Sequence, residues 1–402
     1  MINVVDGVCG SYKTTRMFEY MLSNPDKRYL YITPFLSEIE ERIPEKYPSL
    51  EFHCPVNKGK GKLSNLAELV DQGVNISSTH VLFGMFTPEI VDNIIEKGYC
   101  LVIDEVVDCV GLLPNDFKPK DTEALLTGDF VFINKEERGK LYWNEEKYPN
   151  HDGKYEDIRL LCHLEMLYSY EDEFLMWEYP PKLLKNLDDV FVLTYLFNGS
   201  DMRCWLQLND IPYQYVDKKE WGIKEDKEII EKVRENLTFI ENRNLNSIRQ
   251  TKTALSVGWF DNADASVVRK YRGIMRSAVV QYKPKNVFWT TFKDQAPRLA
   301  GAGYSKGVKN KTDKPSFLPC NIRATNDYVD YDMCMYAMNK FKNPVEVNYM
   351  RSNGVQVDED SYALSEMIQF IFRGSIRANK PMKLLVLSKR MRGLLEGWLN
   401  EE

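Results

Sequence analysis

The sequence predicts an α/β protein with two domains, each built on a parallel sheet, and a mixed α+β insertion in the first domain. Three observations predict this class. Short strands that are apolar throughout alternate with helical segments, as strands covered on both faces of a parallel sheet do. The chain has 402 residues, which suits two or three domains. The alternation is interrupted once, by hairpin and helix patterns, and then resumes.

Apolar, β-rich runs mark the strands. We expect them at residues 2–6, 28–34, 99–105, 188–200, 286–292 and 382–388. The run HVLFGMF at 80–86 reads as a further strand or a loop, and NPVEVNYM at 343–350 reads as a further strand. Apolar residues at helical spacing predict helices between them. These helices are expected at 14–22, 36–43, 88–98, 155–170 and 224–237, with one more at the carboxyl end.

The break in the strand–helix alternation indicates where the insertion and the domain boundary lie. A hairpin pattern around the turn ERGK and the helical run at 155–170 fall within residues 110–188, which we interpret as an insertion. The first domain is therefore predicted at 1–200 and the second at 201–402.

Charge and composition limit the function classes. The net charge of -6 gives no global case for nucleic-acid binding, but the basic stretches 56–63 and 304–314 are suited to phosphates. No apolar run approaches the roughly 18–20 residues that cross a membrane, and the start lacks a signal-peptide pattern. The eight cysteines form no C-x-x-C pair, which argues against zinc. We expect a cytoplasmic protein.

The stretch GVCGSYKTT follows the first strand and opens a helix. A phosphate-binding loop reads G-x-x-x-x-G-K-[ST], and this stretch matches it except at Tyr12, where the second glycine is expected. The backbone N–H groups of such a loop favour an anion. Lys13 would neutralise the β- and γ-phosphates, and the Thr14 hydroxyl would ligate Mg²⁺. The predicted ATP-binding residues are Gly7, Gly10, Ser11, Lys13, Thr14 and Thr15.

The strand YCLVIDE ends in two acids. Open α/β sheets bind ligands at the carboxyl ends of their strands, so Asp104 suits Mg²⁺ and Glu105 suits polarising the attacking water. The alternative is that both acids only cap a strand. A phosphate loop about 90 residues upstream favours the catalytic interpretation.

A third constellation is QFIFRGSIR. Gln369, Arg373 and Arg377 stand at steps of four, which on a helix places them on one face. Two arginines and an amide suit the charge of a γ-phosphate, the role of an arginine finger. Lys13, Asp104 and Glu105 complete the predicted catalytic set.

The order of these motifs resembles the superfamily-two DExD/H-type helicases and translocases. GVCGSYKTT is similar to motif I and YITP to motif Ia, while STH and IDE look like motifs Ib and II. LTYLFNGS is similar to motif III, and VFWTTFKD, NIRATNDYVD and QFIFRGSIR look like motifs IV, V and VI. The resemblance covers most of the chain except the insertion and the stretch around 224–285, and its terse motifs are similar to phage or mobile-element helicases.

The resemblance implies two RecA-like P-loop domains that hydrolyse ATP with Mg²⁺ and move along nucleic acid. We favour DNA over RNA as this partner, and no residue pattern decides between the two. The nucleic-acid-binding residues that it implies are Thr33, Thr79, His80, Thr290, Thr325 and Asn326, to which the basic loop adds Lys306, Lys309 and Lys311. Tyr12, the DEVVD form of motif II and Phe372 depart from the family pattern. These departures bear on catalytic rate more than on nucleotide binding.

Two other functions fit parts of the sequence. A viral DNA-packaging motor ATPase shares a degenerate phosphate loop and an Asp-Glu strand, but it lacks a motif like QFIFRGSIR. A nucleotide-binding scaffold with little turnover would share the loop without the catalysis. No membrane partner is expected.

Overall fold

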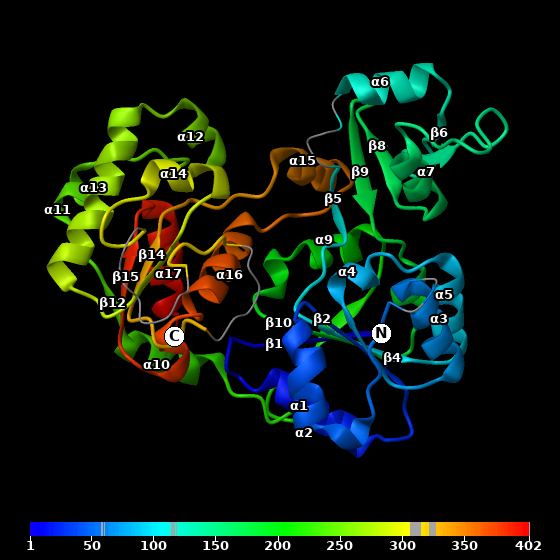
Figure 1. Ribbon diagram of the computed structural model, residues 1–402, viewed down its shortest axis with the longest axis horizontal. Helices are drawn as coiled ribbons and strands as arrows, with labels where there is room; N and C mark the ends of the chain where they lie inside the picture. Colours follow the sequence, from blue (N-terminus) through cyan, green and yellow to red (C-terminus); the bar gives the residue numbers. More distant parts are fainter. Residues whose placement is uncertain are drawn as a thin grey trace. The chain divides into compact units, whose positions relative to one another are not determined.

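The chain folds into two units, shown in the computed structural model in Figure 1. The structure describes residues 1–57, 59, 61–113, 117, 119–305, 315–320 and 327–401. The first unit comprises Met1–Asp6, Lys13–Asp217 and Asn343–Val357. The second unit comprises Gly7–Tyr12, Lys218–Lys342 and Asp358–Glu402. Within the described part of the chain, no helix is both long and apolar enough to span a bilayer.

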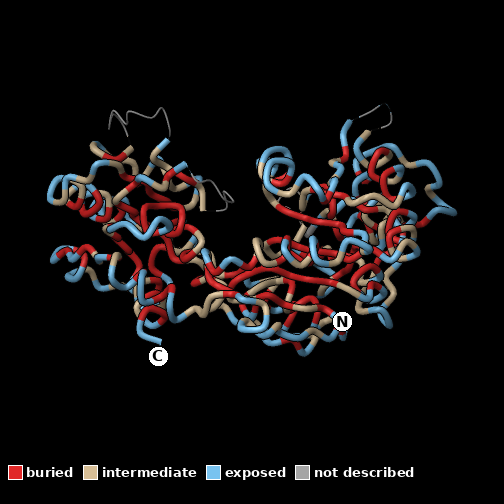
Figure 2. Tube along the Cα trace, turned by 90° about the horizontal axis from the view of Figure 1, so that it is seen from below, coloured by how far each residue is buried: buried red, intermediate tan, exposed pale blue. Residues whose placement is uncertain are grey.

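The first unit is built on a six-stranded parallel sheet. Its strand order is β11-β1-β10-β4-β2-β3. These strands are β1 (Ile2–Asp6), β2 (Tyr29–Thr33), β3 (Ile76–Thr79), β4 (Cys100–Asp104), β10 (Val190–Thr194) and β11 (Tyr213–Tyr215). Every residue of β2, β4 and β10 is buried, which is why these strands read as continuous apolar runs. In Figure 2 the buried residues follow the interior of the unit (red).

Helices and short helical turns connect these strands. The helices are α1 (Lys13–Ser23), α2 (Ile43–Lys46), α3 (Lys62–Gln72), α4 (His80–Phe83), α5 (Pro88–Glu96), α8 (Lys182–Asn186) and α9 (Asp201–Leu208). The turns are η1 (Glu38–Arg42), η2 (Pro48–Leu50) and η3 (Phe197–Gly199). Thr87 and Ser200 cap α5 and α9 by accepting N–H bonds from Ile90 and Arg203. Capping and the amphipathic pattern together explain why these segments are helical.

The insertion forms its own antiparallel sheet in the order β5-β9-β8-β7-β6. Its strands are β5 (Val110–Leu112), β6 (Val131–Asn134), β7 (Lys140–Trp143), β8 (Leu167–Tyr170) and β9 (Phe174–Glu178). Its helices are α6 (Pro119–Thr127) and α7 (Glu156–His163). The predicted hairpin around ERGK is the β6–β7 pair. The helix expected at 155–170 ends at His163, and the following residues form β8.

A helix from the second half of the chain completes the insertion. Helix α15 (Pro344–Ser352) contributes the Glu346 carboxylate, whose Oε1 accepts the Leu112 N–H at 3.0 Å. The Tyr349 hydroxyl donates to the Glu178 carboxylate, which also binds Arg138 at 3.0 Å and is 1% exposed. A buried carboxylate needs such partners, because losing one would leave an uncompensated charge.

The second unit is built on a four-stranded parallel sheet in the order β12-β15-β14-β13. Its strands are β12 (Leu237–Phe239), β13 (Val287–Thr290), β14 (Met333–Tyr336) and β15 (Met382–Val386). Its helices are α10 (Asp226–Asn236), α11 (Arg243–Ser247), α12 (Val257–Asn262), α13 (Ala265–Tyr282), α14 (Ala296–Leu299), α16 (Glu359–Ile371) and α17 (Lys389–Leu399). Two short turns, η4 (Lys293–Gln295) and η5 (Ser375–Ala378), complete it. The predicted α/β class with an α+β insertion is confirmed.

Three local predictions differ from the structure. The run at 343–350 is helix α15 rather than a strand, because Asn343 caps it and Pro344 occupies its first turn. The run at 80–86 opens helix α4, and the strand lies just before it, at Ile76–Thr79. The first sheet also continues past residue 200, because β11 pairs with β1 at the sheet edge.

Candidate nucleotide-binding site

The loop Gly7–Tyr12 connects β1 to α1 and closes tightly on itself. The Ser11 N–H donates to the Val8 carbonyl at 3.1 Å. A Cβ on Gly7 would lie 2.7 Å from Ser11 Oγ, so only glycine fits there without a shift. Ser11 Oγ is buried and has no hydrogen-bond partner among the described residues. A buried hydroxyl in this state is suited to a bound anion, because it would otherwise lose its hydrogen bond.

Tyr12 adopts the backbone conformation of the glycine that it replaces. Its φ is +70°, in the left-handed region, and Gly10 has a φ of +89°. Glycine enters this region freely, whereas another residue costs about 1–3 kcal/mol. The Tyr12 side chain is 51% exposed, so it does not fill the loop. The loop therefore keeps its turn despite the departure from the motif.

Lys13 and Thr14 begin helix α1, as a phosphate loop requires. Lys13 is buried, with 7% of its surface exposed. Thr14 Oγ1 lies 3.3 Å and 3.4 Å from the two carboxylate oxygens of Asp104, at the end of β4. Thr14 of the loop segment thus contacts the acid at the end of β4, although about 90 residues of sequence separate the two. The structure brings together Lys13, Thr14 and Asp104 as the sequence predicts.

Asp104 is the buried acid of this site. It is 5% exposed, and Tyr31 donates its hydroxyl hydrogen to Oδ2 at 2.8 Å. Burial raises the pKa of the Asp104 carboxyl, while the Lys13 charge is the strongest influence in the opposite direction. His80 Nε2 lies 3.0 Å from the Asp104 carbonyl oxygen. A cation beside this carboxylate would offset the unfavourable burial of its charge.

The Thr14 hydroxyl and the Asp104 carboxylate fit Mg²⁺. Magnesium prefers oxygen ligands and is commonly held by one or two protein oxygens together with substrate phosphates. Both side chains supply such oxygens at the amino end of α1. Among the described residues, no group of three or more His, Cys, Asp and Glu side chains forms an all-protein metal site. The donor set is therefore the one expected for a metal that arrives with a nucleotide.

Glu105 lies beside this cluster along the chain. Its backbone is in the left-handed region, with a φ of +61°, and its N–H donates to the Leu193 carbonyl at 2.9 Å. A non-glycine residue with this conformation is uncommon and is concentrated at functional sites. The assignment of Glu105 as the water-polarising base remains a prediction.

Glu38 is a functional candidate that the sequence analysis missed. It lies in η1, is 5% exposed, accepts from Thr33 at 3.2 Å and pairs with Arg42 at 2.7 Å. Burial, followed by the negative charge of Asp104, raises the pKa of Glu38 to about 7. In the sequence, Glu38 and Arg42 look like an ordinary exposed pair on a charged helix. The detectable signal was their position directly after the strand that carries Tyr31 and Thr33.

Several residues predicted to bind nucleic acid lie elsewhere. Thr33 and Thr290 are fully buried, and the Thr33 hydroxyl donates to Glu38 at 3.2 Å. Their assignment to nucleic acid stays a prediction. Thr79 caps α4 by accepting the Leu82 N–H, and His80 contacts the Asp104 carbonyl. The remaining predicted residues, Lys306, Lys309, Lys311, Thr325 and Asn326, lie outside the described residues.

Gln369, Arg373 and Arg377 do not share one helix face. Helix α16 ends at Ile371, and Arg377 lies in the separate turn η5. Gly374 lies between the two elements, and a Cβ there would come within 2.6 Å of Met382 Sδ. Arg373 is 4% exposed and its Nη2 lies 3.4 Å from the Cys320 carbonyl, whereas Arg377 is exposed. Burial lowers the pKa of Arg373. The two arginines therefore occupy different environments.

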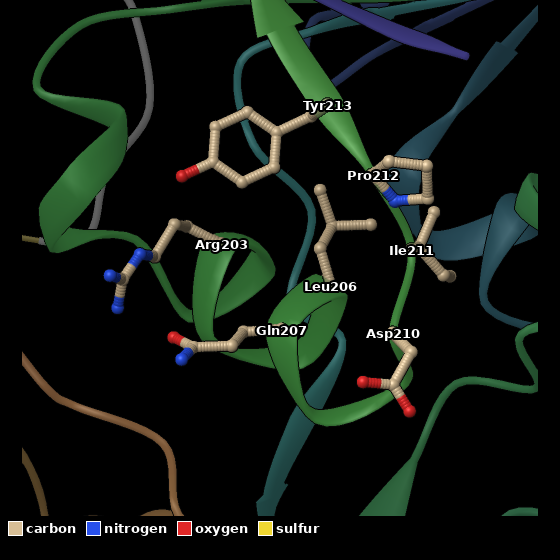
Figure 3. A pocket seen from close by; sticks show the side chains of 7 residues that line it. All are labelled: Arg203, Leu206, Gln207, Asp210, Ile211, Pro212 and Tyr213. Carbon is tan, nitrogen blue, oxygen red and sulfur yellow. The ribbon is translucent and has the colours of Figure 1, made fainter.

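A pocket in the first unit is separate from this site (Figure 3). It lies between α9 and the chain that leads into β11. Its lining residues are Arg203, Leu206, Gln207, Asp210, Ile211, Pro212 and Tyr213. Arg203 donates to the Gln356 carbonyl at 2.5 Å, which holds its guanidinium in place. The pocket shares no residue with the Thr14–Asp104 cluster, so we do not assign it to the same chemistry.

Comparison with known proteins supports this picture of the fold. Two domain models match the chain, the YonV C-terminal Rossmann-like domain over residues 231–399 and the YonV middle domain over 115–177. The second match falls within the insertion sheet. The chain is 29% identical over 426 residues to the SPbeta prophage-derived uncharacterized protein YonV of Bacillus subtilis (strain 168), covering 100% of this chain and 99% of the relative.

Among solved structures, the chain is similar to "Structure of S. tokodaii Xpd4". The TM-score is 0.53 at 14% sequence identity, and the match covers 100% of this chain and 94% of the other. At this identity the likeness concerns the fold. It shows a shared fold, in agreement with two RecA-like domains that are each built on a parallel sheet.

Glu38 gives a testable dependence of stability on pH. The pKa of its carboxyl is about 7 in the folded protein, above the ordinary value of 4.5. Between pH 4.5 and about pH 7, the folded state therefore binds more protons than the unfolded state. The free energy of unfolding consequently falls as the pH rises through this window. Glu38→Gln stays neutral and should lack this contribution. We therefore expect the difference in melting temperature, variant minus parent, to increase by a few °C between pH 5 and pH 8.

The exposed neighbour Glu40 provides the control, since Glu40→Gln removes a charge from the same turn. Melting curves of the parent and both variants across this range would measure the effect. Parallel pH profiles for the parent and Glu38→Gln would contradict the raised pKa.

Proposed function

We propose that this chain is an ATP-dependent nucleic-acid helicase or translocase of the superfamily-two DExD/H type. The observation that carries the proposal is the contact between the Thr14 hydroxyl and the Asp104 carboxylate, beside the buried Lys13. A lysine, a hydroxyl and an acid from distant segments are the parts that hold a metal-bound triphosphate. The helicase-like fold supports the nucleic-acid part of the proposal. The prophage-derived relative supports a phage type.

Each residue of the site would have its own role in ATP hydrolysis. Lys13 would bind the β- and γ-phosphates, and the loop N–H groups with the Ser11 hydroxyl would hold the phosphate oxygens. Thr14 and Asp104 would hold Mg²⁺, which when bound neutralises charge on the phosphates. Glu105 would orient and deprotonate the attacking water. Tyr31 keeps Asp104 in position through its hydroxyl at 2.8 Å.

A cationic surface on the second unit supports a nucleic-acid partner. Between residues 243 and 285 there are nine lysines and arginines but two acids, in a chain whose net charge is -6. Helix α13 contains no acid, and its exposed residues include Arg269, Lys270 and Arg276, which we call the α13 cationic face. Its other side packs on the core through Val268, Tyr271 and Met275. The cations are thus held by a rigid helix, as suits contact with a phosphate backbone. We propose DNA as the nucleic acid.

Two alternatives remain testable against this proposal. A nucleotide-binding scaffold would bind ATP without turnover stimulated by nucleic acid. A viral DNA-packaging motor would show turnover that depends on duplex DNA. Measuring ATP hydrolysis without nucleic acid, with single strands and with duplexes separates the three.

Lys13→Ala and Glu105→Gln should separate binding from cleavage. Lys13→Ala removes the cation aimed at the phosphates, so hydrolysis should be lost. Glu105→Gln keeps the shape of the side chain but removes its basicity, so ATP should still bind while the rate falls about 10²–10⁴-fold. ATP affinity and single-turnover hydrolysis measure the two effects. If the Glu105→Gln variant hydrolyses ATP at the parent rate, Glu105 is not the catalytic base and only caps the strand.

The exposed Arg377 should act on turnover rather than on folding. If it is the arginine finger, Arg377→Ala should lower hydrolysis by about 10³–10⁵-fold and leave ATP affinity and the melting temperature nearly unchanged. Arg373→Ala should instead lower the melting temperature, because that side chain is buried. Lys380→Ala removes a nearby exposed charge and serves as the control. Normal turnover in both arginine variants would exclude an arginine-finger role for this segment.

Reversing the α13 cationic face should weaken nucleic-acid binding. Each phosphate contact on a single strand contributes about 0.7 to the slope of log K against log salt, so replacing Arg269, Lys270 and Arg276 with Glu should reduce the slope by up to about 2. Oligonucleotide binding by fluorescence anisotropy at several salt concentrations measures this slope. The control reverses Lys46, Lys97 and Lys182, three cations of the first unit. Equal slopes for the two triple variants would exclude the α13 face.

A further inference from the structure

Lys224 lies against the phosphate loop in a way that the sequence did not indicate. Its ammonium nitrogen is 4.6 Å from the centre of the Tyr12 ring. Its backbone N–H donates to the Ser11 carbonyl at 3.2 Å. The lysine is therefore attached to the loop at two points, through its side chain and through its main chain. Both contacts involve the residues immediately before Lys13.

The segment around Lys224 is fixed to the loop by further contacts. The Val8 N–H donates to Asp226 Oδ1 at 3.1 Å, and Lys218 pairs with Asp226 Oδ2 at 2.7 Å. Ile223 is buried, and a Cβ on Gly7 would lie 3.6 Å from its Cγ2. These contacts hold the backbone on either side of Lys224. Its position therefore does not depend on Tyr12 alone, whereas the direction of its ammonium group does.

The charge of Lys224 is not neutralised by the described part of the chain. Asp226 neutralises Lys218, but no described carboxylate lies within 4.0 Å of the Lys224 ammonium nitrogen. An aromatic ring attracts a cation through its quadrupole while leaving the full positive charge available. The result is an unneutralised cation held at the edge of a loop whose geometry is that of an anion site. A triphosphate is the ligand that this combination suits.

We propose that Lys224 is a second phosphate-binding lysine of the nucleoside triphosphate site, and that Tyr12 positions it. This inference rests on the proposed function, because it assumes that the loop binds a triphosphate. It also gives a reason for the tyrosine. The left-handed backbone keeps the loop turn that glycine would give, while the side chain supplies the ring on which the ammonium group rests. A glycine at this position would remove the ring beneath the Lys224 ammonium group.

The test measures the affinity of the full-length chain for Mg²⁺·ATP by titration calorimetry. Lys224→Ala should weaken ATP binding about 10- to 100-fold, the range for losing one hydrogen bond to a charged group. Tyr12→Gly should weaken it similarly, and Tyr12→Phe should restore most of the loss because the ring returns. Lys227→Ala, an exposed lysine three residues further on, is the matched control. Melting temperatures establish that each variant is folded.

Coupling between the two residues tests the positioning role. If Tyr12 acts through Lys224, the double variant Tyr12→Gly/Lys224→Ala should bind ATP about as well as either single variant. Additive losses would overturn the positioning role of Tyr12. Unchanged ATP affinity in Lys224→Ala, while the parent binds ATP, would overturn the inference and leave the proposed function standing.

The source of the phosphate is tested with a single-stranded oligonucleotide. A loss of oligonucleotide affinity in Lys224→Ala, with ATP affinity intact, would assign the lysine to nucleic acid and overturn the inference. A loss of ATP affinity alone supports it. A parent chain that binds no ATP would overturn the proposed function together with the inference.

Discussion

The candidate site depends on the parallel order of the first sheet. Strands β1 and β4 are separated by β10 and run in the same direction, so their carboxyl ends lie at one edge. The loop after β1 leads into α1, and the end of β4 carries Asp104. This is why Thr14 and Asp104 come within 3.3 Å although about 90 residues separate them. Without the crossover connections of a parallel sheet, neither motif would have a partner.

Burial of charge is the second constraint on this site. Asp104 and Glu38 are both 5% exposed, and each has a raised pKa because burial disfavours the ionised form. The surrounding donors, Tyr31, Thr33 and Arg42, offset only part of this effect. Buried carboxyl groups with raised pKa values are typical of functional sites rather than of a core selected for stability alone. A cation bound beside Asp104 and Glu38 would therefore stabilise their ionised forms.

The sequence was sufficient for the features that depend on local pattern. Apolar strands, the insertion and the proximity of Thr14 to Asp104 followed from periodicity and motif order. The failures have particular physical causes. The run at 343–350 became α15 because the Asn343 cap and Pro344 in the first turn outweighed its β-like composition. The face proposed for Gln369, Arg373 and Arg377 was lost because helix α16 ends at Ile371, before either arginine. Glu38 was missed because burial cannot be read from a charged helical run.

The position of α15 has a consequence for how the chain is synthesised. Its residues 344–352 belong to the first unit, where they pair with β5 and Glu178, yet they are made after most of the second unit. During translation, the insertion sheet therefore emerges with the Glu178 carboxylate still lacking its Tyr349 donor. Such long-range closure slows folding and prolongs the exposure of incomplete sheets. The first unit can therefore be completed only after residues 344–352 have been made.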